Sequence, residues 1–414
     1  MNFFYKLKKF LGNWTVLDQV AVSGGNFLLV AICAQRLSAS NQGVLIYVIS
    51  IYFFVLFLNI SMYMSGASVL SAKKSSDENH IYFNVLAKMQ IISGFLTSTL
   101  MLFLIIFLND LYKWTLGSYE IIAIYMFLFF QQLSDYYRRS AYIFFEVKKA
   151  AISSFLIYVP RVLFLFLFLE DDPDVVYITM AITAIFPALY LAFLVFKNNI
   201  KIRSYTANLI EHIFFSRLLV VSAILSWVWS YLPLFFLGHF KGNESVAVVG
   251  SIRSLVNFAN VFLEQLEISV AAHLPRVFVN ESKSKLKKVV TKLISIGSTV
   301  WLIGMLAIYF YGSEILESIL GVYYGQYENA FIFLWCSILA YFISRVVSIY
   351  ARSMLNKRVE FVGGVTSVIV GLLGSPFLII EYGINGAALS FVMIFIFSAL
   401  AQLIYMRFCL MIKQ

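Results

Sequence analysis

Long apolar stretches recur along the whole chain, and they constrain its fold more than any other feature. The hydrocarbon core of a bilayer is about 30 Å thick, so a helix needs about 20 mostly apolar residues to cross it. The stretch from Ile91 to Leu108 meets this requirement and holds no charged residue. Of the 414 residues, 61% are hydrophobic and 13% are charged, whereas about 25% are charged in soluble domains. The sequence therefore predicts an all-α integral membrane protein.

Polar and charged breaks between the apolar stretches predict twelve transmembrane helices. The expected spans are 14–35, 44–68, 81–108, 118–137, 149–169, 175–196, 213–237, 246–274, 289–311, 329–351, 361–380 and 385–410. A transmembrane β-barrel would show short segments of alternating polarity instead, so that architecture is excluded.

The distribution of cations predicts the orientation, because loops on the cytoplasmic side hold more Lys and Arg than exported loops. With both termini in the cytoplasm, 24 of the 31 basic residues fall on that side, and only Arg36, Lys113 and Lys241 fall in exported loops. The net charge of +10 then reflects this bias and attraction to anionic membrane lipids. It gives no reason to expect nucleic-acid binding.

Motifs for catalysis, metal binding or nucleotide binding do not stand out. The cysteines Cys33, Cys336 and Cys409 have neither metal-site nor disulfide spacing, and the four histidines are isolated near predicted helix ends. There is no Ser-His-Asp grouping and no Gly-rich phosphate loop. We therefore expect no metal or cofactor, and neither a membrane enzyme nor an ATP-driven pump.

The remaining four basic residues, Lys88, Arg161, Arg253 and Arg345, lie inside predicted spans. A charged side chain at such a depth costs a few kcal/mol, so it usually faces water or a partner. We expect these cations to line an aqueous passage for an anionic cargo. Lys88 could instead extend to the membrane surface.

Arg161 directly follows Pro160, which frees a backbone carbonyl and bends a helix. A side chain at that bend could take part in a site. An equally simple alternative is an ion pair between Arg161 and Asp135 or Glu146.

A polar stripe in the span 246–274 strengthens this expectation. Its members are Arg253, Asn257, Asn260, Glu264 and Glu267, spaced by 4, 3, 4 and 3 residues. Such spacings keep side chains on one face of a helix. Arg253, Asn257 and Asn260 are therefore candidate cargo contacts, while the two glutamates could neutralise Arg253 or bind a coupling cation. The alternative is that the polar residues only join helices by hydrogen bonds.

A short internal match indicates a duplication. Tyr137-Arg138-Arg139-Ser140 corresponds to Tyr350-Ala351-Arg352-Ser353 at an offset of 213 residues, and transporters are often built from two related halves with the cargo site at the repeat interface. Together with the twelve expected spans, this match predicts two pseudo-symmetric lobes of six helices, residues 1–205 and 206–414.

Several short motifs resemble those of bacterial O-antigen and capsular polysaccharide flippases. They are Asp18-Gln19, Ser23-Gly24-Gly25-Asn26-Phe27, Ala34-Gln35-Arg36-Leu37-Ser38 with Gly43, Leu320-Gly321-Val322-Tyr323-Tyr324 and Tyr382-Gly383-Ile384-Asn385-Gly386-Ala387-Ala388. Most of these positions are turn or packing residues, and Gln35 departs from the usual Ala-Arg-Leu pattern. They therefore identify an architecture better than a substrate.

The resemblance implies membership of the multidrug/oligosaccharidyl-lipid/polysaccharide exporter superfamily, with two lobes around a central cavity in the bacterial cytoplasmic (inner) membrane. The implied cargo is a polyprenyl-diphosphate-linked oligosaccharide for O-antigen, lipopolysaccharide or capsule synthesis. The implied partners are a polysaccharide polymerase and glycosyltransferases. Its phosphates suit Arg161, Arg253, Arg345 and Lys88. The implied energy source is a proton or sodium gradient, with Asp18, Asp135, Glu264 and Glu267 as candidate coupling sites.

Two other functions remain open from the sequence. A cation-coupled multidrug exporter of the same superfamily would favour an acidic passage over this basic one. A membrane scaffold for glycan assembly would use the polar stripes only as helix contacts.

Overall fold

A computed structural model describes residues 13–71, 76–144, 146–197, 206–271, 283–353 and 358–412 of the chain. All regular elements in these ranges are helical, as expected from the sequence. The chain divides into two compact units, Met1–Ile224 and Leu225–Gln414. We describe each unit by itself.

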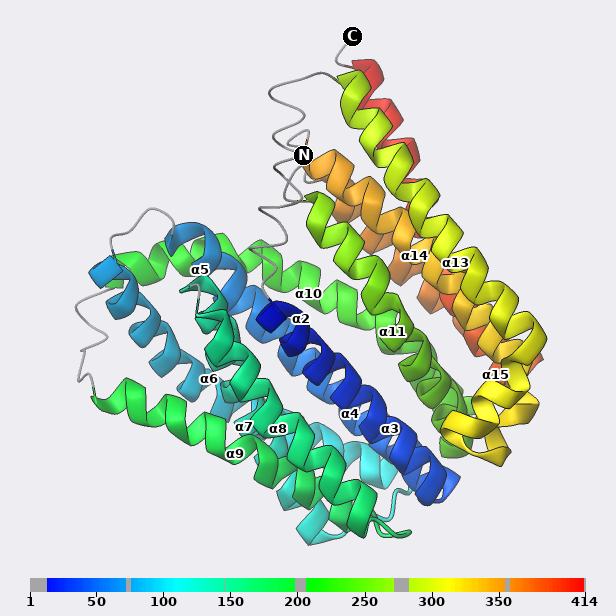
Figure 1. Cartoon of the computed structure of the whole chain (residues 1–414), viewed down its shortest axis with the longest axis horizontal. Helices are drawn as coiled ribbons and strands as arrows, with labels where there is room; N and C mark the ends of the chain where they lie inside the picture. The colour runs from blue at the N-terminus through cyan, green and yellow to red at the C-terminus, as the bar shows by residue number, and fades with distance from the viewer. Residues whose placement is uncertain are drawn as a thin grey trace. The chain divides into compact units, whose positions relative to one another are not determined.

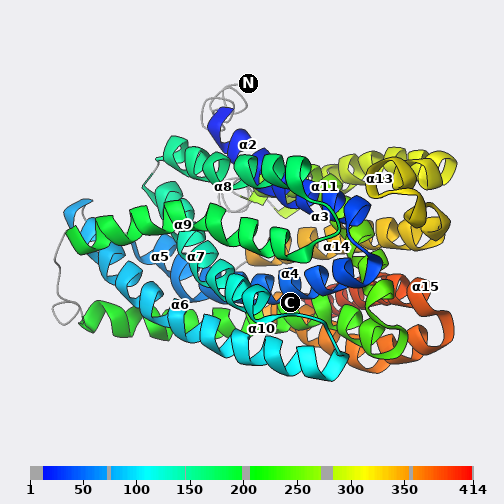
Figure 2. The ribbon, with the colours of Figure 1, turned by 90° about the horizontal axis from the view of Figure 1, so that it is seen from below.

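The first unit is a bundle of long helices (Figures 1 and 2). In chain order its elements are α2 (Asn13–Gln19), η1 (Val20–Gly24), α3 (Gly25–Arg36), α4 (Ala39–Asn59), η2 (Ile60–Met64), α5 (Ser65–Leu70), α6 (Ser76–Tyr112), α7 (Ser118–Ile143), α8 (Val147–Phe168), α9 (Pro173–Lys197) and the first part of α10 (Thr206–Lys241). Helix α7 packs against α6, α8 and α9, and α8 also packs against α2 and α3.

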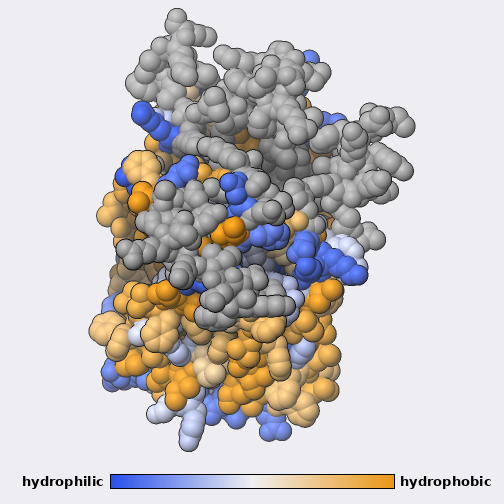
Figure 3. All heavy atoms as spheres, turned by 90° about the vertical axis from the view of Figure 1, so that its left-hand side faces the viewer, coloured by the Kyte–Doolittle hydropathy of each residue, from blue (hydrophilic) through white to orange (hydrophobic). Residues whose placement is uncertain are grey.

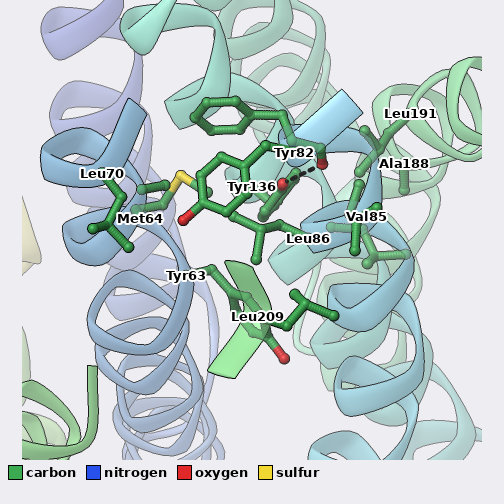
Figure 4. Close-up of a cluster of buried hydrophobic side chains, with 14 residues drawn as sticks. Tyr63, Met64, Leu70, Tyr82, Val85, Leu86, Tyr136, Ala188, Leu191 and Leu209 are labelled. Carbon is green, nitrogen blue, oxygen red and sulfur yellow. Dashed lines mark hydrogen bonds between the residues drawn. The ribbon is translucent and has the colours of Figure 1, made fainter. Parts of the chain in front are cut away.

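A buried apolar cluster holds η2, α5, α6, α7, α9 and α10 together in this unit (Figure 4). It includes Tyr63, Tyr82 and Tyr136, which bring hydroxyl groups into the bundle. A buried hydroxyl needs a hydrogen-bond partner, and Tyr136 Oη donates to the Phe83 carbonyl at 2.9 Å. The aromatic rings thus fill space while their polar ends are satisfied.

The first two membrane helices each contain a turn of π-helix, η1 and η2. A π-helical turn alters the backbone hydrogen-bond pattern and is frequent at functional sites. Next to η1, a side-chain carbon at Gly25 would lie 2.6 Å from Cβ of Tyr158. Glycine is therefore required where the first helix approaches α8.

The second unit contains the remainder of α10 followed by α11 (Asn243–Ala271), α13 (Lys283–Leu320), η5 (Val322–Tyr327), α14 (Glu328–Ser353) and α15 (Arg358–Ile412). Helix α14 packs against α11, α13 and α15. Helix α15 is broken at Gly383, which has φ 58° and ψ −125°. This break separates the expected spans 361–380 and 385–410.

Nine helices among the described residues are long and apolar enough to cross a membrane. The expected spans 118–137 and 246–274 fall in α7 and α11, which are long but hold several charged residues. The pair 361–380 and 385–410 falls in one continuous candidate, Arg358–Arg407. The count of twelve, and the lobe boundary at residue 205, remain predictions.

Large apolar side chains are exposed on the outside of both units, as a bilayer requires. Phe103 and Phe186 are examples in the first unit, and Phe310 in the second is 66% exposed. Figure 3 shows apolar residues covering much of the lower part of one face.

Candidate functional site

Arg161 is enclosed in the first unit, where α8 places it between α7 and α9. Its side chain is 1% exposed. Its guanidinium donates from Nε to Thr183 Oγ1 at 3.0 Å, and from Nη2 to Gln131 Oε1 at 2.8 Å and the Met180 carbonyl at 3.2 Å. It also lies over the rings of Phe127 and Tyr158.

The suggested ion pair of Arg161 with Asp135 or Glu146 is wrong for the described residues. Glu146 pairs with Lys149 at 2.6 Å, and Asp135 pairs with Arg138 at 3.6 Å. Arg161 keeps its charge among neutral oxygens and aromatic rings. Because its side chain has almost no exposed surface, a cargo could reach it only after these helices move.

Arg253 on α11 has similar neighbours but a different degree of exposure. Its Nη1 donates to the Ser230 carbonyl at 2.5 Å, and its central carbon lies 4.8 Å from the ring centre of Tyr231 and 4.5 Å from that of Phe391. The side chain is only half-buried. Among the described residues its Nε and Nη2 have no hydrogen-bond acceptor, and it makes no ion pair. Several donors of a guanidinium, which has five N–H groups, are therefore left for a ligand.

The other predicted cargo contacts lie on three helices. Lys88 on α6 and Arg345 on α14 are half-buried, and Asn257 on α11 is exposed. Arg253 and Asn257 are one helical turn apart on α11, as the stripe predicts. The side chains of Asn260, Glu264 and Glu267 lie outside the described part of the structure.

Asp18 and Asp135, the two predicted coupling residues of the first unit, belong to one buried network. Asp18 Oδ2 accepts from Arg138 Nη1 at 3.1 Å and from Tyr142 Oη at 2.5 Å, while Asp18 Oδ1 accepts from Ser154 Oγ at 2.5 Å. Asp135 accepts from Tyr52 Oη and also pairs with Arg138. The guanidinium of Arg138 thus lies between the two carboxylates and supplies the positive charge that a bound cation would supply.

The position of Arg138 corrects one expectation from the sequence. The span 118–137 placed this residue in a cytoplasmic loop, but α7 continues to Ile143 and Arg138 is 6% exposed. The signal in the sequence was its neighbour Asp135, three residues earlier on the same helix face. Hydropathy alone could not show that the last two turns of α7 are buried.

A second polar cluster, which the sequence did not single out, joins α4, α6 and α7. Asn59 Nδ2 donates to Gln132 Oε1 at 2.9 Å, and Gln90 Nε2 donates to Asn59 Oδ1 at 3.1 Å. Gln132 Nε2 reaches the Gly94 carbonyl and Ser98 Oγ, each at 2.8 Å. These amides are buried and uncharged, and their hydrogen bonds join the three helices. This role is the alternative to cargo binding that the sequence leaves open for polar residues inside helices. Within the described ranges, no group of three or more His, Cys, Asp or Glu side chains could hold a metal ion.

Comparison of the sequence with protein-family models and with curated proteins gives no match. Solved structures, in contrast, share the fold. The lipid II flippase MurJ in an inward closed conformation is 13% identical, with a TM-score of 0.71 over 95% of this chain and 87% of that chain. An inward-facing multidrug resistance MATE family transporter of the MOP superfamily is 12% identical, with a TM-score of 0.74 over 96% of each chain.

A third similar structure is a MOP superfamily transporter from Pyrococcus furiosus. It is 11% identical, with a TM-score of 0.62 over 95% of this chain and 96% of that chain, and it is described by a binding pocket of reverse polarity that suggests a different function. At these identities the likeness shows the fold alone. The chain has the fold of MOP superfamily transporters.

Proposed function

We propose that the chain is a flippase that moves polyprenyl-diphosphate-linked oligosaccharide repeat units, the precursors of O-antigen or capsule. Transport runs from the cytoplasmic to the outer leaflet of a bacterial inner membrane by alternating access. The observation that carries the proposal is Arg253, a half-buried guanidinium on α11 with no carboxylate partner among the described residues. A fold shared with a lipid II flippase supports it.

The diphosphate of such a lipid is the chemical group that Arg253 suits best. A guanidinium binds phosphate oxygens through parallel charge-assisted hydrogen bonds. A lone cation in a membrane helix is costly, and an arriving anion offsets that cost. Arg345, Lys88, Asn257 and Asn260 are proposed as further contacts to the headgroup, while the prenyl chain remains in lipid.

Arg161 is proposed to act differently from Arg253. Its three hydrogen bonds join α8 to α7 and α9, so in the described conformation it positions helices. It can reach the cargo only in a conformation that opens this part of the bundle.

Coupling to a proton or sodium gradient is part of the proposal, with Asp18, Asp135, Glu264 and Glu267 as candidate sites. In the first unit Arg138 already bridges the two aspartates. An ion can use them only when one of them leaves Arg138.

Transport can be measured with the purified full-length protein in liposomes that contain a polyprenyl-diphosphate-linked disaccharide. An impermeant glycosidase added outside reports how fast the sugar reaches the outer leaflet. We expect flipping by the wild-type protein and a rate about ten- to a hundredfold lower for Arg253→Gln, since a charge-assisted hydrogen bond contributes about 1.5 to 3 kcal/mol. The Phe310→Ala variant, altered on the exposed surface of α13, is the matched control. A wild-type rate no higher than that of protein-free liposomes would overturn the proposal.

The likeness to a MATE family transporter over 96% of both chains favours a cation-coupled multidrug exporter as a second candidate. That function predicts efflux of cationic dyes from the same liposomes, driven by an imposed ion gradient. It also predicts that Arg253→Gln leaves efflux unchanged or raises it, because the guanidinium repels a cationic cargo.

A further inference from the structure

An aromatic cluster surrounds Arg253 in the second unit, and none of the roles given above uses it. Arg253 lies over Tyr231 and Phe391. Phe395, one turn after Phe391 on α15, lies 5.1 Å from both Trp229 and Tyr341, measured between ring centres. Trp229 and Tyr341 also contact each other, at 6.3 Å. Trp229, Tyr341 and Phe395 thus form one group of contacting rings from α10, α14 and α15, and the two rings under Arg253 lie two residues from Trp229 on α10 and one turn from Phe395 on α15.

The rings around Arg253 and Trp229 differ in burial. Phe391 and Phe395 are buried, whereas Trp229, Tyr231 and Tyr341 are half-buried. The apolar rings are thus enclosed, and the rings that carry an N–H or O–H group are partly open. Tryptophan and tyrosine favour such positions because one end is apolar and the other can hydrogen-bond.

Trp229 differs in its hydrogen bonding from Trp301 and Trp335, two other tryptophans of this unit. Trp301 and Trp335 each donate their indole N–H to the other residue's carbonyl, at 2.9 and 3.1 Å. The indole N–H of Trp229 has no acceptor within the described ranges, although its ring packs on Phe395 and Tyr341. It therefore offers both a ring face and a hydrogen-bond donor.

Trp229 and Arg253 are neighbours through residues of both α10 and α15. Trp229 directly precedes Ser230, whose carbonyl accepts from Arg253. Phe391 and Phe395 are about 6 Å apart along α15, at 1.5 Å of rise per residue, and they contact Arg253 and Trp229 respectively. The first sugar of such a lipid is attached directly to the phosphate, so a phosphate on Arg253 leaves Trp229 within reach of that sugar.

We propose that Trp229 and Tyr341, with Arg253, form a glycosyl-phosphate site in the second unit, in which the guanidinium binds the diphosphate and the aromatic faces bind the first sugar. The C–H groups of a sugar ring pack on an aromatic face, and its hydroxyls accept hydrogen bonds from groups such as the indole N–H. This inference rests on the proposed function and adds to it the part of the cargo that the aromatic residues recognise.

Binding of two lipids to the full-length protein in nanodiscs tests the site. One probe is a bare polyprenyl diphosphate, and the other is the same lipid carrying one N-acetylhexosamine. The variants are Trp229→Leu, which keeps an apolar side chain but loses the ring, and Trp229→Phe, which keeps a ring face. Tyr341→Leu tests the second ring, Arg253→Gln removes the guanidinium, and Phe310→Ala is the control for losing an exposed aromatic residue of the same unit.

We expect the wild-type protein to bind the glycosylated lipid more tightly than the bare one. Trp229→Leu and Tyr341→Leu should each weaken binding of the glycosylated lipid about three- to tenfold, the range of an aromatic contact, and leave binding of the bare lipid unchanged. Trp229→Phe should keep most of the preference. Arg253→Gln should weaken both lipids.

Two outcomes separate this inference from the proposed function. If both lipids bind and neither leucine variant changes their ratio, the aromatic face is only helix packing and the inference is overturned, while the flippase proposal stands. If the wild-type protein binds neither lipid, both fail. Equal weakening of both lipids by Trp229→Leu, with a lowered melting temperature, would also overturn the inference, because it would show a structural role.

Discussion

At the scale of single residues, Arg161 and Arg253 have the same kinds of neighbours but different access. Both lie over two aromatic rings and donate to a backbone carbonyl. Arg161 additionally bonds Gln131 and Thr183 and is almost fully enclosed, whereas Arg253 is half-buried. The first arrangement stabilises the bundle, and the second leaves donors for a ligand.

This difference predicts that the same substitution affects stability at Arg161 and lipid binding at Arg253. Arg161→Gln should lower the free energy of unfolding by about 1 to 3 kcal/mol, because buried acceptors lose their donor. Arg253→Gln should change the melting temperature less and should weaken polyprenyl diphosphate binding. Thermal melts of both purified variants, read beside lipid binding, check this. A larger loss of stability in Arg253→Gln, with binding intact, would contradict the assignment of roles.

The Asp18–Arg138–Asp135 network leads to a second residue-scale prediction. Arg138→Met removes the one cationic partner that the two buried carboxylates have in the described part of the chain, and breaking a buried pair costs about 3 to 5 kcal/mol. We expect a corresponding fall in thermal stability. The triple variant Asp18→Asn, Asp135→Asn, Arg138→Met removes the uncompensated charge and should be more stable than the single variant. A triple variant that is less stable than Arg138→Met would show that the carboxylates contribute through other contacts.

At the scale of elements, glycines decide where helices can break or approach one another. Gly383 interrupts α15 with a φ of 58°, a conformation that other residues rarely adopt. Nearby, a side chain at Gly386 would overlap the carbonyl oxygen of Leu378. These two glycines make the break between the two halves of α15 possible.

Gly383→Ala should therefore destabilise the protein, by about 1 to 3 kcal/mol for a residue held in an unfavourable backbone conformation. Gly364→Ala on the same element is the matched control. It lies in helical backbone with no atom within 4 Å of the added carbon, and alanine is favoured over glycine there by about 0.5 to 1 kcal/mol. Melting temperatures of the two variants should move in opposite directions. A similar fall in both would show that the break at Gly383 does not depend on glycine.

At the scale of the whole molecule, the sequence predicted the helical architecture because apolar runs of membrane length are a local signal. It also predicted the break near Gly383, because a polar and charged break interrupts the last apolar run. It could not predict the network around Arg138, since residues 18, 52, 135, 138, 142 and 154 meet only through packing of four helices. The sequence also could not predict that Arg161 is enclosed while Arg253 is half-buried. Hydropathy indicates depth in the membrane but not which neighbours cover a side chain.

The predicted number of membrane crossings depends on α7 and α11, which are not among the nine candidate membrane helices of the described ranges. Both helices are long, but both hold charged side chains. In α7 the charges of Asp135 and Arg138 are neutralised inside the bundle, which removes most of the cost of placing them in a membrane. We therefore expect α7 to cross, and α11 to cross with Arg253 at its proposed site.

Single cysteines in a variant without native cysteines can test both crossings in intact cells with an impermeant thiol reagent. Lys113→Cys and Glu146→Cys lie at exposed positions on either side of α7. For α11, Glu244→Cys lies at an exposed position in its first turn and Lys288→Cys at an exposed position near the start of α13. If both helices cross, Lys113→Cys and Glu244→Cys react from outside, while Glu146→Cys and Lys288→Cys react only after the cells are opened. Labelling of both members of a pair from the same side would mean that the helix between them does not cross. The orientation expected from the basic residues would then have to be revised for every later loop, because each missing crossing reverses the sidedness of all that follows.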